Sequence, residues 1–227
     1  MTLEALGSLR SEVVLVGGAS TGLLMTDSAA AGERPTEDLD FIVNCTARGL
    51  HALEARLRDH HQFEQRPDLD DPVCRWRRGD VVIDLVPTDG SIHGFSSRWY
   101  LDAWRTAEAR VVAGYPVRVI SAIMFVATKL DAFGDRGQGD YQASEDLEDV
   151  IAVVDGRPEL LDELTRAPSD ARAYVTERIG QLLAEPRFVD AVFGHLDGDD
   201  QRMPIVMERL RSLAVLDTMA ANPPTDF

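Results

Sequence analysis

Residues 14–24 read VLVGGASTGLL. A run of strand-forming side chains stops at two glycines, Gly17 and Gly18, and then passes into a segment typical of a helix start. A glycine pair between a strand and a helix has two common uses. It permits a tight turn, or it lets backbone amides approach a phosphate closely at the start of a helix. The stretch by itself fits both uses, so the rest of the chain must decide between them.

The composition is that of a globular protein with room for a sizeable core. The chain has 227 residues, of which 44% are hydrophobic and 27% charged. No apolar stretch approaches the roughly 20 residues that span a bilayer. The start, MTLEALGSLRSE, carries an early acid and no apolar core, so we expect no signal peptide and a cytoplasmic location. Cys45 and Cys74 have no CxxC spacing, which predicts two buried thiols rather than zinc ligands.

The net charge restricts the kinds of partner. The formal charge is −16, which does not hold nucleic acid by bulk electrostatics. Acidic residues gathered in one site can, however, collect divalent cations, and those cations can bind phosphate. The charge therefore directs attention to where the acids cluster.

The predicted elements divide the chain into a mixed half and a helical half. In the first half the pattern predicts strands over 11–16, 39–44, within 72–87 and within 108–120. It predicts helices over 2–10, 19–31, 47–62 and 96–105. After Ser121 every predicted element is a helix: 121–133, 144–155, 158–167, 169–184, 186–194 and 200–217. We therefore predict an α+β protein in which a mixed sheet with flanking helices (1–120) precedes a helical domain (121–220) and a disordered tail (221–227).

Three acids occupy predicted strands. Asp38 and Asp40 lead into one strand, and strand alternation sends both to the same face. Asp84 lies inside the apolar run VVIDLV, where a lone charge is costly. Two carboxylates on one face repel each other unless a cation sits between them. Magnesium ions shared by the acids would lower all of these costs.

This order of features resembles the nucleotidyltransferase superfamily related to DNA polymerase β, and more nearly its AbiEii-type toxin branch. The resemblance is carried by Gly17-Gly18 followed by RPTEDLD (34–40), which matches the branch pattern Arg-x-Ser/Thr-x-Asp-x-Asp. KLDAF (129–133) and EDLED (145–149) are similar to its Lys-bearing helix and its D-x-x-D helix. The resemblance covers about residues 11 to 154 and implies a nucleotidyltransferase-like fold for the first half.

The resemblance also implies site residues and cofactors. Asp38 and Asp40 would hold two Mg²⁺ ions, with Mn²⁺ as the alternative, and Asp84 would bind the second ion or act as general base. Lys129 would neutralise phosphate charge, and Asp146 or Asp149 would assist near the nucleotide or acceptor. The implied catalytic set is Asp38, Asp40, Asp84 and Lys129. The implied nucleotide-binding set is Gly17, Gly18, Ser20, Thr21, Arg34, Lys129 and Asp146.

The implied reaction moves an NMP from an NTP to an acceptor hydroxyl and releases pyrophosphate. The relatives suggest a tRNA end or a protein in a toxin–antitoxin setting, with an antitoxin protein as partner, or a small hydroxylated molecule such as an aminocyclitol drug. The acidic charge favours a cationic small molecule or a protein over a long RNA. No membrane partner is expected.

Two alternatives stay open. GGASTG after a strand, with acids about 20 residues further on, also suits a Rossmann-type dinucleotide site, although Asp38 and Asp40 begin a strand instead of ending one. A catalytically inactive interaction module is the second alternative. The basic run RWRR (75–78) is typical of the outer face of a hairpin. RNA contact, with Trp76 stacking on a base, is the other interpretation of that run.

Overall fold

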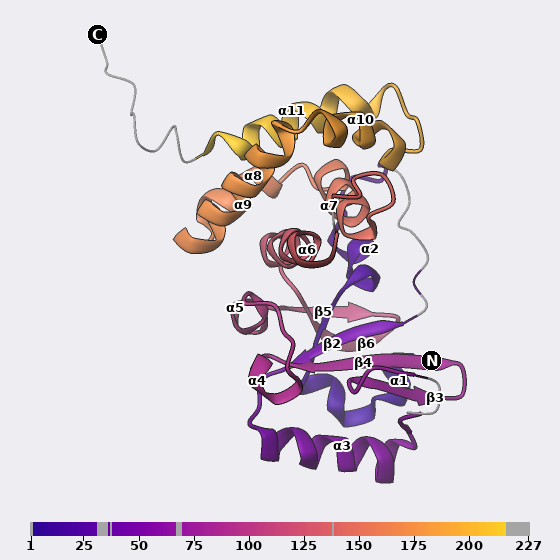
Figure 1. The fold of residues 1–227 in the computed structure, drawn as a ribbon. Helices are drawn as coiled ribbons and strands as arrows, with labels where there is room; N and C mark the ends of the chain where they lie inside the picture. Colours follow the sequence, from indigo (N-terminus) through magenta and orange to yellow (C-terminus); the bar gives the residue numbers. More distant parts are fainter. Residues whose placement is uncertain (1, 31–35, 37, 67–69, 138, 217–227) are drawn as a thin grey trace. The chain divides into compact units, whose positions relative to one another are not determined.

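The chain forms two compact units (Figure 1). This computed structural model describes all residues except 1, 31–35, 37, 67–69, 138 and 217–227. The first unit, here called the sheet unit, combines Met1–Ser20 with Arg34–Ser121. The second, the helical unit, combines Thr21–Glu33 with Ala122–Phe227. The predicted disordered tail, 221–227, lies outside the described residues.

The described part of the sheet unit contains one sheet of six strands. They are β1 (Val14–Val16), β2 (Leu39–Val43), β3 (Arg75–Arg78), β4 (Val81–Pro87), β5 (Glu108–Val112) and β6 (Tyr115–Val119). Their order is β3-β4-β2-β1-β6-β5. β1 runs antiparallel to β2 and parallel to β6, and β2 runs parallel to β4, so the sheet is mixed. The predicted α+β class is confirmed.

The antiparallel pairing of β1 with β2 removes one alternative. A Rossmann site requires a parallel βαβ unit in which the second strand lies parallel to the first. Here the chain returns from β1 to an antiparallel neighbour, with Val16 opposite Asp40. The dinucleotide-binding interpretation of GGASTG is therefore wrong.

Short helices and one long helix complete the sheet unit. They are α1 (Thr2–Ala5), η1 (Gly7–Ser11), η2 (Gly18–Ser20), α3 (Ala47–His61), α4 (Gly90–His93) and α5 (Tyr100–Arg105). α3 runs along one face of the sheet (Figure 1) and buries Leu50, Leu53 and Leu57, which recur at helical spacing. Thr46 caps its start by accepting a hydrogen bond from the Gly49 amide.

The helical unit consists of α2 (Thr21–Leu24), α6 (Ala122–Arg136), α7 (Glu145–Gly156), α8 (Leu160–Arg166), α9 (Ser169–Leu183), α10 (Pro186–His195) and α11 (Arg202–Ala214). Its core contains fully buried apolar side chains from several helices, among them Phe125, Ile151, Val154 and Val206. In the described residues, each helix is too short or too polar to cross a bilayer.

The helix predicted over residues 19–31 is much shorter than expected. Only η2 and α2 form, and α2 ends at Leu24. Beyond it the amides of Thr26 and Asp27 donate to the Gly156 carbonyl at the end of α7, over 2.7 and 2.9 Å. The Arg157 guanidinium donates to the Leu24 carbonyl over 2.6 Å. These long-range hydrogen bonds replace the next helical turn, so a tertiary contact overrides the local helix preference of the alanines.

Candidate functional site

A row of side chains crosses the strands of the sheet unit. Asp40 on β2 stands opposite Asp84 on β4, and Asp84 stands opposite Arg75 on β3. Residues directly opposite each other point to the same face of a sheet. Asp38 lies just before β2, and the same Arg75 that binds Asp84 also contacts the Asp38 carboxylate. The structure therefore brings together the predicted acids, here called the acidic group: Asp38, Asp40 and Asp84.

Arg75 binds two members of the acidic group. Its Nε and Nη2 donate to the two carboxylate oxygens of Asp84 over 2.9 and 2.7 Å. The same Nη2 donates to Oδ2 of Asp38 over 2.5 Å. The hydrogen bonds to Asp84 hold the pKa of Arg75 well above its ordinary value, so the guanidinium is charged throughout the physiological range. The Arg75 guanidinium thus compensates part of the negative charge of the acidic group.

Gly17 makes room for the third acid. Its φ of +67° lies in the left-handed region, and a Cβ built there would lie 1.9 Å from Oδ2 of Asp40. The Ser20 amide and hydroxyl both donate to the Gly17 carbonyl, over 3.1 and 2.7 Å, and fix the turn. The glycine therefore serves a tight turn against Asp40. Phosphate contacts of Gly17, Gly18 and Ser20 stay predictions. The helix that follows has only four residues, so the expected helix dipole contributes little.

Replacing Gly17 with alanine should destabilise the sheet unit more than a glycine replacement elsewhere with the same backbone strain. Gly79 is the matched control, because its φ is +58° and nothing lies within 4 Å of its Cβ position. Gly79→Ala should cost about 1–2 kcal/mol from the left-handed backbone alone. Gly17→Ala should cost about 1–3 kcal/mol more, because the methyl group displaces the Asp40 carboxylate. Urea unfolding measures both, and equal losses would rule out the collision.

The other predicted site residues lie in the helical unit, in a second charged cluster. The Lys129 Nζ lies 2.6 Å from Oδ2 of Asp149 and 3.3 Å from Oδ1 of Asp146. Thr21 donates to Asp149 over 3.2 Å, and Arg136 donates twice to Asp146 over 3.0 and 2.9 Å. Asp146, Asp149 and Lys129 are all buried. We call Thr21, Lys129, Asp146 and Asp149 the buried charge cluster.

These contacts link helices α2, α6 and α7 within the helical unit. Burial raises the pKa of Asp146, but the hydrogen bond from Arg136 and the charge of Lys129 outweigh it, so that pKa lies below its usual value. Lys129 is held between two carboxylates by helices α6 and α7. The phosphate contact predicted for Lys129, and the nucleotide contacts predicted for Thr21 and Asp146, stay predictions. Arg34 lies outside the described residues.

The acidic group supplies the oxygen ligands that Mg²⁺ and Mn²⁺ prefer. Within the described residues, no three His, Cys, Asp or Glu side chains are arranged to hold a metal ion. In this structure Arg75 contacts oxygens of both Asp38 and Asp84. The type of donor suits a divalent cation, and two of the three donors are paired with the arginine.

Arg75 is the residue that the sequence interpretation missed. The basic run was expected to be an outer hairpin face or an RNA contact, but Arg77 pairs with Asp71 over 2.7 Å. Trp76 is only 1% exposed, so the expectation that it stacks on a base is wrong. The missed signal was the hairpin register. Arg78 opposite Val81 places Arg75 opposite Asp84.

The cysteines differ from each other. Both are free thiols, but Cys74 is buried while Cys45 is half-buried, so the prediction of two buried thiols is wrong for Cys45. Burial, together with the charge of Asp84, raises the pKa of Cys74 to about 12. The Cys74 thiol therefore stays protonated beside the acidic group.

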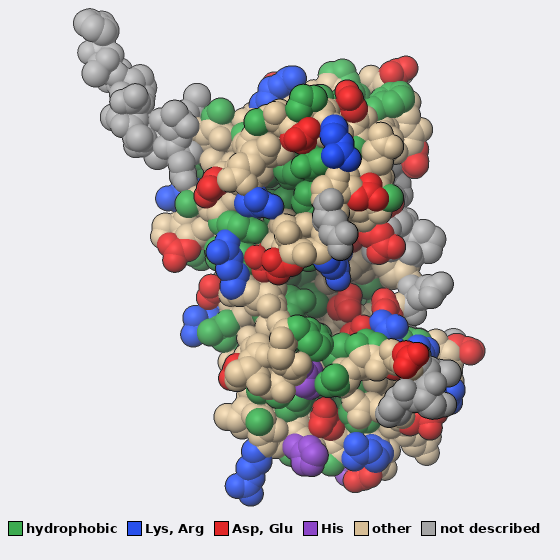
Figure 2. All heavy atoms as spheres, in the orientation of Figure 1, with side chains coloured by type: hydrophobic (Ala, Val, Ile, Leu, Met, Phe, Trp, Pro, Cys, Tyr) green, Lys and Arg blue, Asp and Glu red, His purple; other side chains and the backbone are tan. Residues whose placement is uncertain are grey.

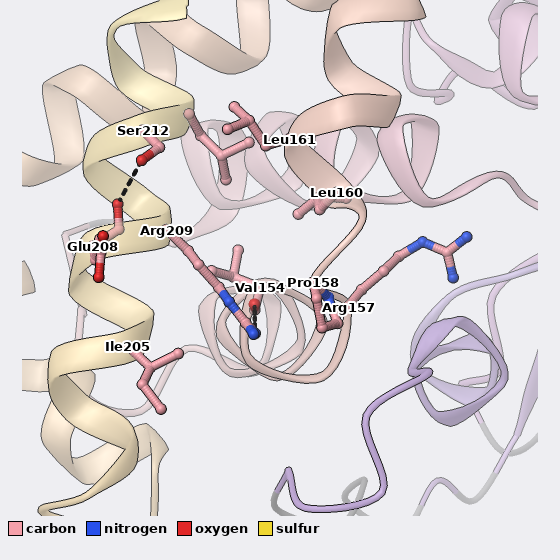
Figure 3. Close-up of a pocket in the computed structure, with 10 residues that line it drawn as sticks. Val154, Arg157, Pro158, Leu160, Leu161, Ile205, Glu208, Arg209 and Ser212 are labelled. Carbon is pink, nitrogen blue, oxygen red and sulfur yellow. Dashed lines mark hydrogen bonds between the residues drawn. The ribbon is translucent and has the colours of Figure 1, made fainter.

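A cavity of about 270 Å³ in the helical unit lies at the end of α7, between α8 and α11 (Figure 3). Its Arg209 donates to the Val154 carbonyl over 3.0 Å and so caps α7. Arg157 extends away from the cavity and pairs with Glu163. None of the predicted site residues lines it.

On the face drawn in Figure 2, acidic and basic side chains are interspersed.

Comparison with known proteins gives one structural similarity. No protein-family profile matches the chain, and no curated protein matches it either. A solved structure, described as an antigenic nucleotidyltransferase-like protein from Paracoccidioides brasiliensis, is similar to this chain with a TM-score of 0.49 and 17% sequence identity. The similarity covers 85% of this chain and 90% of that chain.

Proposed function

We propose that the chain is a metal-dependent nucleotidyltransferase that moves an NMP from an NTP to an acceptor hydroxyl. The observation that carries the proposal is the acidic group, in which Asp40 and Asp84 are paired on neighbouring strands and Arg75 joins Asp38 to Asp84. Three carboxylates gathered in this way raise the free energy of each other's ionised form unless cations compensate their charge. A site built to collect cations is suited to a polyphosphate substrate.

Each acid has a role in the proposed reaction. Asp38, Asp40 and Asp84 would hold the divalent cations, which when bound would neutralise triphosphate charge and polarise phosphoryl oxygens. The acceptor oxygen forms a bond to the α-phosphorus as the bond from that phosphorus to the bridging oxygen breaks, and pyrophosphate leaves. Asp84 orients the acceptor hydroxyl and takes its proton. Turn amides at Gly17 and Gly18 would meet the triphosphate.

The acceptor is proposed by class. The AbiEii-type resemblance supports a tRNA end or a protein, with an antitoxin protein as partner, and resistance-type relatives support a small hydroxylated molecule. The net charge of −16 favours a cationic small molecule or a protein over a long RNA. A toxin role follows from the first two acceptors and not from the third.

Nucleotide binding tests the proposal before the acceptor is known. Calorimetry with each NTP and Mg²⁺ should give binding that weakens at least about tenfold in the Asp38→Asn/Asp40→Asn variant, because two cation ligands are lost. Asp80→Asn is the control, since Asp80 is an exposed carboxylate in the turn between β3 and β4. It should bind like the wild type. Equal binding by both variants would contradict the assignment of the acids.

A catalytically inactive interaction module is the second candidate. The pairing of Arg75 with Asp38 and Asp84 favours it, because a permanently bound guanidinium would keep cations out. That candidate predicts that the wild type binds no NTP in the presence of Mg²⁺. The same calorimetric titration therefore separates the two functions.

A further inference from the structure

Arg75 contacts the same kind of carboxylate oxygen that a divalent cation would bind. It contacts both carboxylate oxygens of Asp84 and one oxygen of Asp38. Asp84 lies between Arg75 and Asp40 in the row across the sheet. Three carboxylates and one guanidinium leave two negative charges in the group. A guanidinium and a metal ion would bind the same oxygens, so their binding is in competition.

We propose that Arg75 is a built-in substitute for a divalent cation, which holds Asp38 and Asp84 until a metal ion displaces it. The inference rests on the proposed function, since it assumes that the acidic group takes a divalent cation. It adds a regulatory element to the proposed nucleotidyltransferase. The pairing of Arg75 with Asp38 and Asp84 stabilises the metal-free chain and weakens the binding of a divalent cation.

The surroundings of Arg75 permit this exchange. β3 stands at one end of the sheet order, and the Arg75 side chain is 24% exposed. Its neighbours Cys74 and Trp76 are 4% and 1% exposed, so the backbone of the strand is anchored in the core. The guanidinium can therefore turn toward solvent by side-chain rotation alone, while the strand keeps its place.

Arg77 provides a matched control. It lies on the same strand and face as Arg75, and its side chain is 26% exposed against 24% for Arg75. It also forms a bidentate ion pair with one carboxylate, that of Asp71, over 2.7 and 2.8 Å. Arg77→Gln therefore removes a comparable ion pair whose hydrogen bonds go to Asp71 and not to the acidic group, although the charge of Asp84 still acts on Arg77.

The experiment measures Mn²⁺ binding by electron paramagnetic resonance of the free ion, together with urea unfolding with and without Mn²⁺. Arg75→Gln should bind Mn²⁺ about tenfold more tightly than the wild type, because the competing charge is gone. Without Mn²⁺ this variant should be less stable than the wild type, and Mn²⁺ should restore the loss. Arg77→Gln, which removes a cation without freeing an oxygen of the acidic group, should raise Mn²⁺ affinity much less than Arg75→Gln does. A merely structural Arg75 would give the stability loss without the restoration.

The outcomes separate the inference from the proposed function. If Arg75→Gln binds Mn²⁺ no more tightly than the wild type, and Asp40→Asn abolishes that binding, the competition is refuted while the metal site stands. If the tighter binding survives the addition of Asp40→Asn, the ion is bound elsewhere and the inference is overturned. If no variant binds Mn²⁺, both fail. Should Arg75→Gln not fold, Arg75→Lys serves instead. The lysine side chain keeps the positive charge but loses the bidentate contact with Asp84, so a gain in Mn²⁺ affinity is again expected.

Discussion

Replacing Asp84 with asparagine is expected to lower the rate of NMP transfer about a hundred- to a thousandfold while the fold is kept. Asparagine has nearly the same shape, and its Oδ1 can still accept the hydrogen bond that Arg75 Nε donates to Asp84 over 2.9 Å. The Nη2 group of Arg75 loses its acceptor on residue 84 and keeps the one on Asp38. What is lost is the charge that would hold a cation and the group that would take the acceptor proton. Alanine is a poorer choice, because it would leave Arg75 without its main partner.

The measurement is label transfer from NTPs to a panel of acceptors: total tRNA, a protein extract and small aminocyclitols. Asp80→Asn, at the exposed turn of the same hairpin, should transfer label at the wild-type rate. Circular dichroism and urea unfolding verify that the Asp84→Asn protein is folded. A folded Asp84→Asn protein with wild-type transfer would remove Asp84 from the proposed reaction.

Replacing Asp149 with alanine should destabilise the helical unit by about 3–5 kcal/mol, the cost of stranding a buried charge. Asp149 is 1% exposed, and its carboxylate lies 2.6 Å from the Lys129 ammonium. Without it, Lys129 keeps the longer contact with Asp146, which is already bound twice by Arg136. Urea unfolding gives the loss, and Glu148→Ala on the same helix is a control that should stay within about 0.5 kcal/mol of the wild type.

A double-mutant cycle shows whether the pair is structural. Lys129→Ala combined with Asp149→Ala should destabilise less than the sum of the single changes, with a coupling of about 1–3 kcal/mol. Additive losses would mean that Lys129 and Asp149 do not depend on each other. Such a result would strengthen the prediction that Lys129 serves phosphate instead.

Most of the elements were predictable because their signals are local. β2 and β4 follow apolar runs that are interrupted only by Asp40 and Asp84, and α3 follows the spacing of Leu50, Leu53 and Leu57. β5 and β6 lie within the predicted range 108–120, and the turn between them has positive φ at Ala113 and Gly114. Neighbouring residues carry all of this information, so a single sequence suffices.

Two features needed contacts between distant residues. The end of α2 at Leu24 depends on hydrogen bonds to Gly156 and Arg157, more than 130 residues away. The approach of Arg75 to Asp38 depends on the parallel pairing of β2 with β4, which no local pattern reports. The Arg75–Asp84 contact lies between these two cases: it is not a nearest-neighbour signal, but the register of a single hairpin already implies it.

The sequence by itself determined most of the strands and helices, because alternation and helical periodicity follow from backbone geometry. It did not determine the use of Gly17-Gly18 in VLVGGASTGLL. The tertiary structure shows a turn whose glycine leaves space for the Asp40 carboxylate, 1.9 Å from where a Cβ would stand. It also shows that the cation beside the acids is Arg75 of the chain itself. Both facts arise from strand register, which is fixed by long-range hydrogen bonds and packing and not by the residues next to each position.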